Sequence, residues 1–241
     1  MPSTIVPATV GFWWASTTTE TYETALYTVP AGMLVNALFL YCWRIFPTFF
    51  PTRSLRVLLV QVTLAALAVW AVLAIAFVSL AQSEWIPIQV LGFGCVAIQV
   101  FAGVATCWSD TPAPAGARRA DLVTLLLRGV LAGSAIGFSV WLASLGSPLL
   151  AGMASVFPAI FLTTMISTWL TQGKAVPMGA VGPIMLGSSS VSAYALSAIW
   201  TLPWWGALWG SIASWLFAVC VVSVPAWIFL RRRPRGPGAD P

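Results

Sequence analysis

Two apolar stretches of this sequence are dense in hydroxyl side chains, and each contains a proline within the apolar run. A proline lacks the amide donor of other residues, so it frees a carbonyl one turn earlier and kinks or breaks a helix. In lipid, such a carbonyl needs a partner, and Ser and Thr hydroxyls are suitable ones. Broken helices line the midplane sites of many transporters. The pattern predicts a path for a small polar or zwitterionic solute, lined by Pro158, Thr163, Thr164, Pro183, Ser188, Ser189 and Ser190.

The same residues also fit a simpler interpretation. Ser and Thr in a helix often donate to a carbonyl of the preceding turn, and small residues in lipid often serve only to pack helices together. The sequence leaves both interpretations open. They differ in accessibility, because a lining face is wet in at least one state, whereas a packing face stays dry.

Three further polar side chains interrupt apolar stretches. Asn36 and Gln99 are amides, and each is expected to make an interhelical hydrogen bond, with Gln99 also a candidate lining residue. Arg128 lies about two turns into its stretch, where its long side chain can reach the headgroups. An arginine at the bilayer centre would cost at least ~3 kcal/mol. The alternative for Arg128 is a fixed positive charge in a cytoplasm-facing vestibule that attracts an anionic substrate or a lipid phosphate.

Three glycines, Gly129, Gly133 and Gly137, follow Arg128 at four-residue spacing and therefore share one helix face. Another helix backbone can approach such a face closely, and van der Waals packing then drives association. Packing within the same chain is one interpretation, and a homodimer interface is the other.

Much catalytic chemistry is missing from the sequence. It contains no histidine, and its six acidic residues fall in tails, in loops or at segment edges. The sequence has no phosphate-binding loop and no HExxH motif, and a serine nucleophile would lack a histidine base. The four cysteines show no CxxC spacing. We therefore expect no enzyme activity, no metal site and no cofactor.

The elements that carry these residues are apolar segments. Hydrophobic residues make up 59% of the 241-residue chain and charged residues only 7%, and the mean hydropathy is +0.92. A bilayer core needs about 20 helical residues. The sequence predicts an all-α polytopic membrane protein with a membrane domain over residues 29–230 and seven spans at about 29–47, 56–80, 86–107, 122–143, 148–170, 177–200 and 205–230.

The basic residues of the loops fall on one side of this arrangement. They lie in the loops after the first, third and fifth spans and in the tail at 231–241. The positive-inside rule then predicts an outside N-terminus and a basic cytoplasmic C-terminal tail. The net charge of +5 is accordingly assigned to topology and to contact with the lipid bilayer, and no nucleic acid partner is expected.

The first 28 residues are predicted to be an exposed tail with an aromatic patch, because they lack the features of a signal peptide. The motif Ala-Gly-Met occurs at residues 31–33 and again at residues 151–153, 120 positions later. Together with the segment lengths, this hints at a degenerate parallel repeat of a four-helix unit that lacks its first helix.

The second half resembles the GlpM-like group of small multipass membrane proteins. The resemblance rests on Ser147-Pro148-Leu-Leu-Ala-Gly152 before a proline-containing helix, the turn at Gly173 and the small-residue helix with Ser188 to Ser190. It implies a compact four-helix unit and transfers no catalytic or binding residue.

The leading functional hypothesis is a small transporter or permease-like protein, with its path between the two hydroxyl-rich spans. Facilitated diffusion or export fits better than proton-driven pumping, because no carboxylate or histidine lies at membrane depth. The alternative is a non-transporting scaffold, assembly factor or accessory subunit of a membrane complex.

Overall fold

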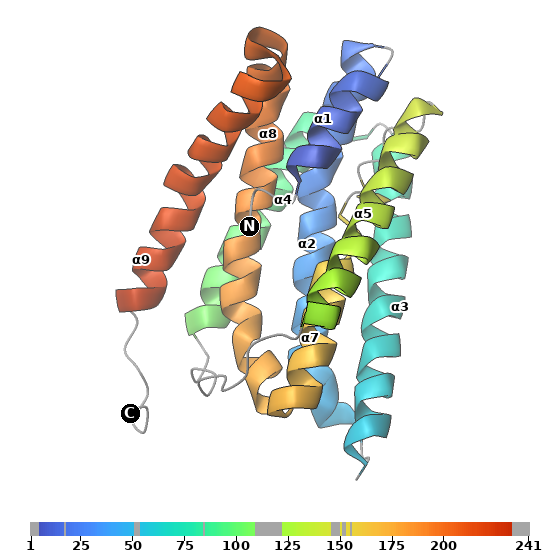
Figure 1. The fold of residues 1–241 in the computed structure, drawn as a ribbon, viewed down its shortest axis with the longest axis vertical. Helices are drawn as coiled ribbons and strands as arrows, with labels where there is room; N and C mark the ends of the chain where they lie inside the picture. The colour runs from blue at the N-terminus through green and yellow to red at the C-terminus, as the bar shows by residue number, and fades with distance from the viewer. Residues whose placement is uncertain are drawn as a thin grey trace.

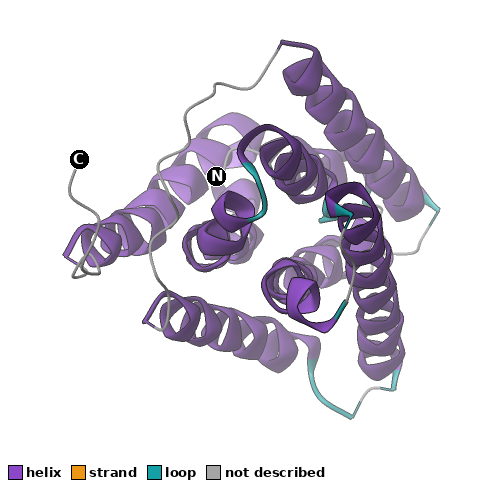
Figure 2. Ribbon diagram, turned by 90° about the horizontal axis from the view of Figure 1, so that it is seen from below, coloured by secondary structure: helices purple, strands orange, loops and turns teal. Residues whose placement is uncertain are grey.

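The computed structural model describes residues 5–16, 18–50, 54–83, 85–108, 122–145, 150, 153–154 and 156–232. All regular structure in these ranges is helical (Figures 1 and 2), so the predicted all-α class is confirmed. The elements are α1 (Val6–Ala15), α2 (Thr19–Phe49), α3 (Leu55–Gln82), α4 (Ile88–Trp108), α5 (Leu122–Ser144), α7 (Ala159–Gln172), α8 (Ala175–Ala218), a π-helix (Val219–Ser223) and α9 (Val224–Arg232).

The central helix of the bundle is α2, which lies between α8 and α4 on one side and α3 on the other (Figure 1). It begins where Thr18 caps it, with the Thr18 hydroxyl accepting a hydrogen bond from the Thr21 amide at 3.2 Å. Burial covers 83% of the most apolar window of α2 but only 17% of the corresponding window of α3. The outer helices therefore present most of their apolar surface outward, as lipid-facing helices do.

The chain turns back on itself inside α8, at Gly206. This residue has φ +72° and ψ 176°, a backbone conformation that side-chain-bearing residues rarely adopt. The hydroxyl of Thr201 reaches the carbonyl of Gly210 at 3.0 Å and the hydroxyl of Ser214 at 2.5 Å. These residues could not meet in one straight helix. Two antiparallel arms result: the first arm, residues 175–205, and the second arm, residues 207–232.

Four helices of the described chain are long and apolar enough to cross a membrane. They are Thr19–Phe49, Leu55–Gln82, Ile88–Trp108 and the 58-residue run Ala175–Arg232, which contains both arms. The structure thus supports a multi-pass membrane protein, while the count of seven spans stays a prediction. At 14 residues, α7 is about 21 Å long, shorter than a bilayer core.

The prediction of an exposed tail over residues 1–28 is wrong for the residues that the structure describes. Phe12 of α1 is fully buried in the main apolar cluster, and α2 already begins at Thr19. The hydroxyl of Tyr22 donates to the Ala198 carbonyl at 2.7 Å, which ties the start of α2 to α8. The first span was predicted to begin at about residue 29, whereas α2 begins ten residues earlier and contains Pro30 in its interior.

The predicted fifth span also differs from the structure. It was expected over about residues 148–170 with a kink or a break at its proline, and its described part is interrupted at residues 156–158 and becomes regular only at Ala159. The sixth and seventh predicted spans correspond to the two arms. The turn between them falls at Gly206, and Pro203 lies within the helix.

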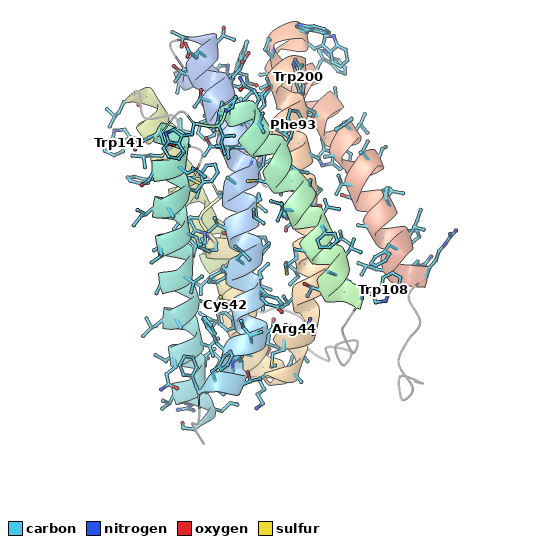
Figure 3. All side chains as sticks on the ribbon, turned by 180° about the vertical axis from the view of Figure 1, so that it is seen from behind. Cys42, Arg44, Phe93, Trp108, Trp141 and Trp200 are labelled. Atoms are coloured by element: carbon cyan, nitrogen blue, oxygen red, sulfur yellow. The ribbon has the colours of Figure 1, made fainter. Side chains whose placement is uncertain are left out.

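Charged side chains of the described chain separate by end. Arg44, near the end of α2, lies at the same end of the bundle as Trp108 (Figure 3). The start of α3 with Arg56, the α7–α8 turn with Lys174 and the end of α9 also lie at this end (Figure 1). Glu20 and Glu23 occupy the opposite end, in the first turns of α2.

Candidate functional site

Ser188, Ser189 and Ser190 occupy three successive positions on the first arm of α8, and all three are fully buried. Their hydroxyls donate to carbonyls of the preceding turn, at distances of 2.8, 2.6 and 2.8 Å for residues 188, 189 and 190. Each donor is thus satisfied within its own helix, which is the packing interpretation of these residues.

Thr163 and Thr164 behave in the same way on α7. The Thr163 hydroxyl donates to the Ala159 carbonyl at 2.8 Å, and the Thr164 hydroxyl donates to the Ile160 carbonyl at 2.6 Å. Both threonines are only partly buried. The structure therefore gives their hydroxyls local partners, and it shows no interaction between them and the serines of α8.

Gln99 brings α4 and α8 together, as its predicted interhelical hydrogen bond requires. Its amide nitrogen donates to the Ser188 hydroxyl, and its amide oxygen accepts from the Ser192 hydroxyl, each at 3.1 Å. All three side chains are fully buried. The orientation of the amide follows from this hydrogen-bond network. Ser192 is a functional partner that the sequence analysis did not select, although it lies one turn after Ser188.

Two glycines make this α4–α8 contact exceptionally close. A Cβ atom added to Gly103 would lie 2.9 Å from the Leu186 Cα, and one added to Gly182 would lie 3.1 Å from the Cys107 backbone nitrogen. The helix backbones touch at both points, which is how small residues stabilise helix pairs in lipid. The amide–serine network is accordingly part of a buried, closely packed helix interface.

The break before α7 is the second place where polar groups meet at depth. Pro158 precedes the first residue of α7, so the predicted break at this proline is confirmed. The carbonyl of Val156 accepts a hydrogen bond of 2.6 Å from the Asn36 amide nitrogen. The Trp70 indole donates to the Asn36 amide oxygen at 2.8 Å. Asn36 thereby joins α2, α3 and the broken segment, an interhelical role that fits its sequence interpretation.

The close approach of the broken segment depends on Gly32. A Cβ atom at Gly32 would lie 2.0 Å from the Val156 Cγ2 and 3.5 Å from the Met153 Sδ. Gly32 of the first Ala-Gly-Met motif therefore lies close to Met153 of the second. Phe157 packs edge to face on Trp70, with ring centroids 5.2 Å apart, and holds the segment against α3.

Pro183 does not interrupt its helix. It lies inside α8, whose described residues depart from helical geometry only at Gly206. Of the two outcomes predicted for this proline, a kink or a break, the structure shows no break. Neighbouring helices can compensate for the missing donor of such a proline. Arg128 belongs to α5, but its side chain lies outside the described part of the structure.

The glycine face of α5 points away from the rest of the chain. Gly129, Gly133 and Gly137 are exposed, and an added Cβ would meet no atom within 4 Å at any of them. Packing within the chain, one of the two interpretations of this face, is therefore wrong for these residues. The internal contact of α5 is made further along the helix, where Val140 meets Gly11 of α1.

The described residues contain no group of three or more His, Cys, Asp or Glu side chains that could hold a metal ion. Cys42, Cys95 and Cys107 are buried, and no disulfide joins the described cysteines. The polar groups of the candidate site are therefore amides and hydroxyls, which can hydrogen-bond but supply no strong acid or base.

Comparison with protein-family models, with curated proteins and with solved structures found no match for this chain. The resemblance of its second half to GlpM-like proteins stays a prediction.

Proposed function

We propose that this chain is a non-transporting, membrane-embedded component of a larger assembly: a scaffold, assembly factor or accessory subunit. The proposal rests on the burial and internal hydrogen bonding of the hydroxyl-rich face of the first arm. Ser188, Ser189 and Ser190 are buried and satisfied within the protein. A face that binds a passing solute would need donors or acceptors available to that solute, whereas a packing face needs none.

The surface available to partners supports the same proposal. The face with Gly129, Gly133 and Gly137 is open and flanked by exposed apolar side chains such as Val130 and Phe138, which are 65% and 53% exposed. A second copy of the chain is the simplest partner for this face, because two glycine faces allow backbones to approach closely in a homodimer.

The association can be tested by substitution of the central glycine. Gly133→Leu should abolish self-association in bilayers, measured by energy transfer between differently labelled copies, while the free energy of unfolding changes by less than about 0.5 kcal/mol. Gly94→Leu on α4 is the matched control, since Gly94 also has no atom within 4 Å of an added Cβ. Energy transfer that survives Gly133→Leu would exclude a homodimer through this face.

A transporter or permease-like protein is the second candidate function, favoured by the break before α7. Discontinuous helices occur at the solute sites of transporters, and here Asn36 and the Val156 carbonyl meet at such a break. The matching experiment places a cysteine at Phe157, which is 40% exposed. Labelling of Phe157→Cys by an impermeant thiol reagent would favour a water-filled path, and its failure would favour the scaffold.

Under either candidate function, the proposed orientation has the N-terminus outside and the C-terminus in the cytoplasm. It is supported by the basic residues at the end of α2, the start of α3 and the end of α9, which lie at one end of the bundle. No catalytic step, cofactor or nucleic acid partner forms part of the proposal.

A further inference from the structure

A lipid-facing groove runs between α1 and the second arm. It has a volume of about 680 Å³ and is lined by Val6, Val10, Trp14, Ala207, Leu208, Ser211, Ile212 and Trp215. Several of its walls are open to the surroundings, since Trp14 is 75% exposed and Leu208 is 67% exposed. Apart from one serine, the lining residues are apolar or aromatic.

That serine, Ser211, is unlike the other serines described above. It is 9% exposed, and its hydroxyl has no hydrogen-bond partner among the described residues. On the first arm, Ser188 donates to the Met185 carbonyl of its own helix, and Ser192 donates to Gln99 of α4. Ser214, three residues further along the second arm, is paired with Thr201. Buried polar groups without partners are rare in folded proteins, so a missing partner at Ser211 requires an explanation.

The depth of Ser211 indicates what the partner is. The arm starts at Gly206, and the exposed tryptophans Trp204 and Trp209 flank this turn. Exposed tryptophans mark the membrane–water boundary. Ser211 lies five residues beyond Gly206, or about 7.5 Å along the helix axis. This is the layer just inside the boundary, where the ester carbonyls of diacyl lipids lie above their acyl chains.

We propose that the groove is a binding site for one acyl chain of a diacyl ester lipid, with the Ser211 hydroxyl donating to the ester carbonyl oxygen. The proposal requires the serine side chain to take a staggered position in which its hydroxyl faces the groove. A neighbouring transmembrane helix would also fill the apolar walls, and a helix carbonyl accepts a second hydrogen bond, as Ala198 does from Tyr22. The depth of Ser211 in the ester layer is what favours a lipid over a helix. A lipid ester supplies both the apolar chain and the acceptor. This site is independent of the proposed scaffold function.

The experiment compares two lipids that differ only at the proposed acceptor. The full-length protein, purified in detergent and stripped of lipid, is titrated with a diacyl phosphatidylglycerol and with its diether analogue, and bound lipid is counted by native mass spectrometry. We expect the ester lipid to bind about fivefold more tightly than the ether lipid, the equivalent of ~1 kcal/mol for one hydrogen bond. Ser211→Ala should remove this preference and leave the affinity for the ether lipid unchanged.

Filling the groove with a large side chain provides a second, independent test. Ala207→Phe should abolish binding of both lipids at this site. The matched control is Ala213→Phe, which fills the neighbouring apolar hollow of about 580 Å³ lined by Trp205, Trp209, Ile212, Ala213 and Leu216. This control should leave the ester preference intact.

Three results would overturn the proposal. The first is equal affinity for ester and ether lipids in the unmodified protein, and the second is an ester preference that survives Ser211→Ala. The third is a change of oligomeric state in Ala207→Phe with lipid binding unchanged, which would assign the groove to a second copy of the chain.

Discussion

The hairpin at Gly206 joins two arms of one apolar helical run, and the arms have opposite environments. The first arm is buried: its Tyr194, Ala195 and Leu202 are fully inaccessible. The second arm remains largely on the surface, with Trp209 66% exposed and Trp227 54% exposed. Both arms nevertheless belong to one apolar helical run of 58 residues, Ala175–Arg232.

Side-chain size and polarity separate the arms. The first arm carries Gly182 and a run of serines where it meets α2 and α4, so backbones approach and hydroxyls bond within the interface. The second arm carries large aromatic and aliphatic side chains on its exposed surface. In lipid, where apolar burial does not drive helices together, small residues mark the packed arm and large residues mark the lipid-facing arm.

The largest expected effect is a clash in the packed region. Gly103→Leu would push a side chain into the Leu186 backbone, and we expect the free energy of unfolding to fall by about 3 kcal/mol, measured by chemical denaturation in detergent. Leu216→Ala on the second arm, at a residue that is 49% exposed, should change it by less than about 0.5 kcal/mol. Equal losses in the two variants would remove the distinction between the arms.

The next effect concerns the break before α7. Asn36→Leu leaves the Val156 carbonyl and the Trp70 indole unpaired, and we expect a loss of about 1–3 kcal/mol in the free energy of unfolding. Trp70→Phe removes one of the two hydrogen bonds and should cost less than Asn36→Leu. A stability unchanged by Asn36→Leu would mean that the amide does not hold the broken segment.

A smaller effect is expected in the buried network of the first arm. Gln99→Met keeps the side-chain length but removes the bonds to Ser188 and Ser192. Ser188 still donates to the Met185 carbonyl, so the loss should be about 1.2 kcal/mol, from two bonds at the membrane-protein average of about 0.6 kcal/mol each. A double-mutant cycle with Ser192→Ala measures the coupling, and a coupling of zero would contradict the observed contact.

The smallest effect is expected at the unpartnered serine of the second arm. In lipid-free detergent, Ser211→Ala removes a hydroxyl that makes no hydrogen bond, so the free energy of unfolding should stay the same or rise slightly. Ser214→Ala, three residues away, loses its bond to Thr201 and should be destabilised by about 1 kcal/mol. An equal fall in the free energy of unfolding in both variants would show that the Ser211 hydroxyl, like that of Ser214, makes a stabilising hydrogen bond.

Much of the fold follows from local signals in the sequence. Apolar segment lengths predicted the helical class, and the break at Pro158 followed from the missing amide of proline. The interhelical role of Gln99 followed from the cost of an unpaired amide in lipid. The sequence did not predict the partners of Gln99, because Ser188 and Ser192 lie 89 and 93 residues further along the chain.

Where the predictions failed, tertiary contacts decided the outcome. The glycine spacing of α5 correctly groups Gly129, Gly133 and Gly137 on one face, but spacing alone does not say which neighbour that face meets. The first 28 residues looked like a tail because their polar threonines dilute the apolar signal. Burial of Phe12 and the bond from Tyr22 to Ala198 bring this region into the bundle.

The central claim, that the hydroxyl-rich face of the first arm is a dry packing interface, is tested most directly by cysteine labelling. In a background without the four native cysteines, Ser189→Cys is exposed in membrane vesicles to a charged, impermeant thiol reagent from each side. Ser54→Cys and Ser83→Cys are the controls, at exposed positions flanking the two ends of α3. We expect Ser54→Cys to react only from the cytoplasmic side and Ser83→Cys only from the outside, while Ser189→Cys reacts from neither. Labelling of Ser189→Cys from either side would contradict the dry interface and restore a solute path through the first arm.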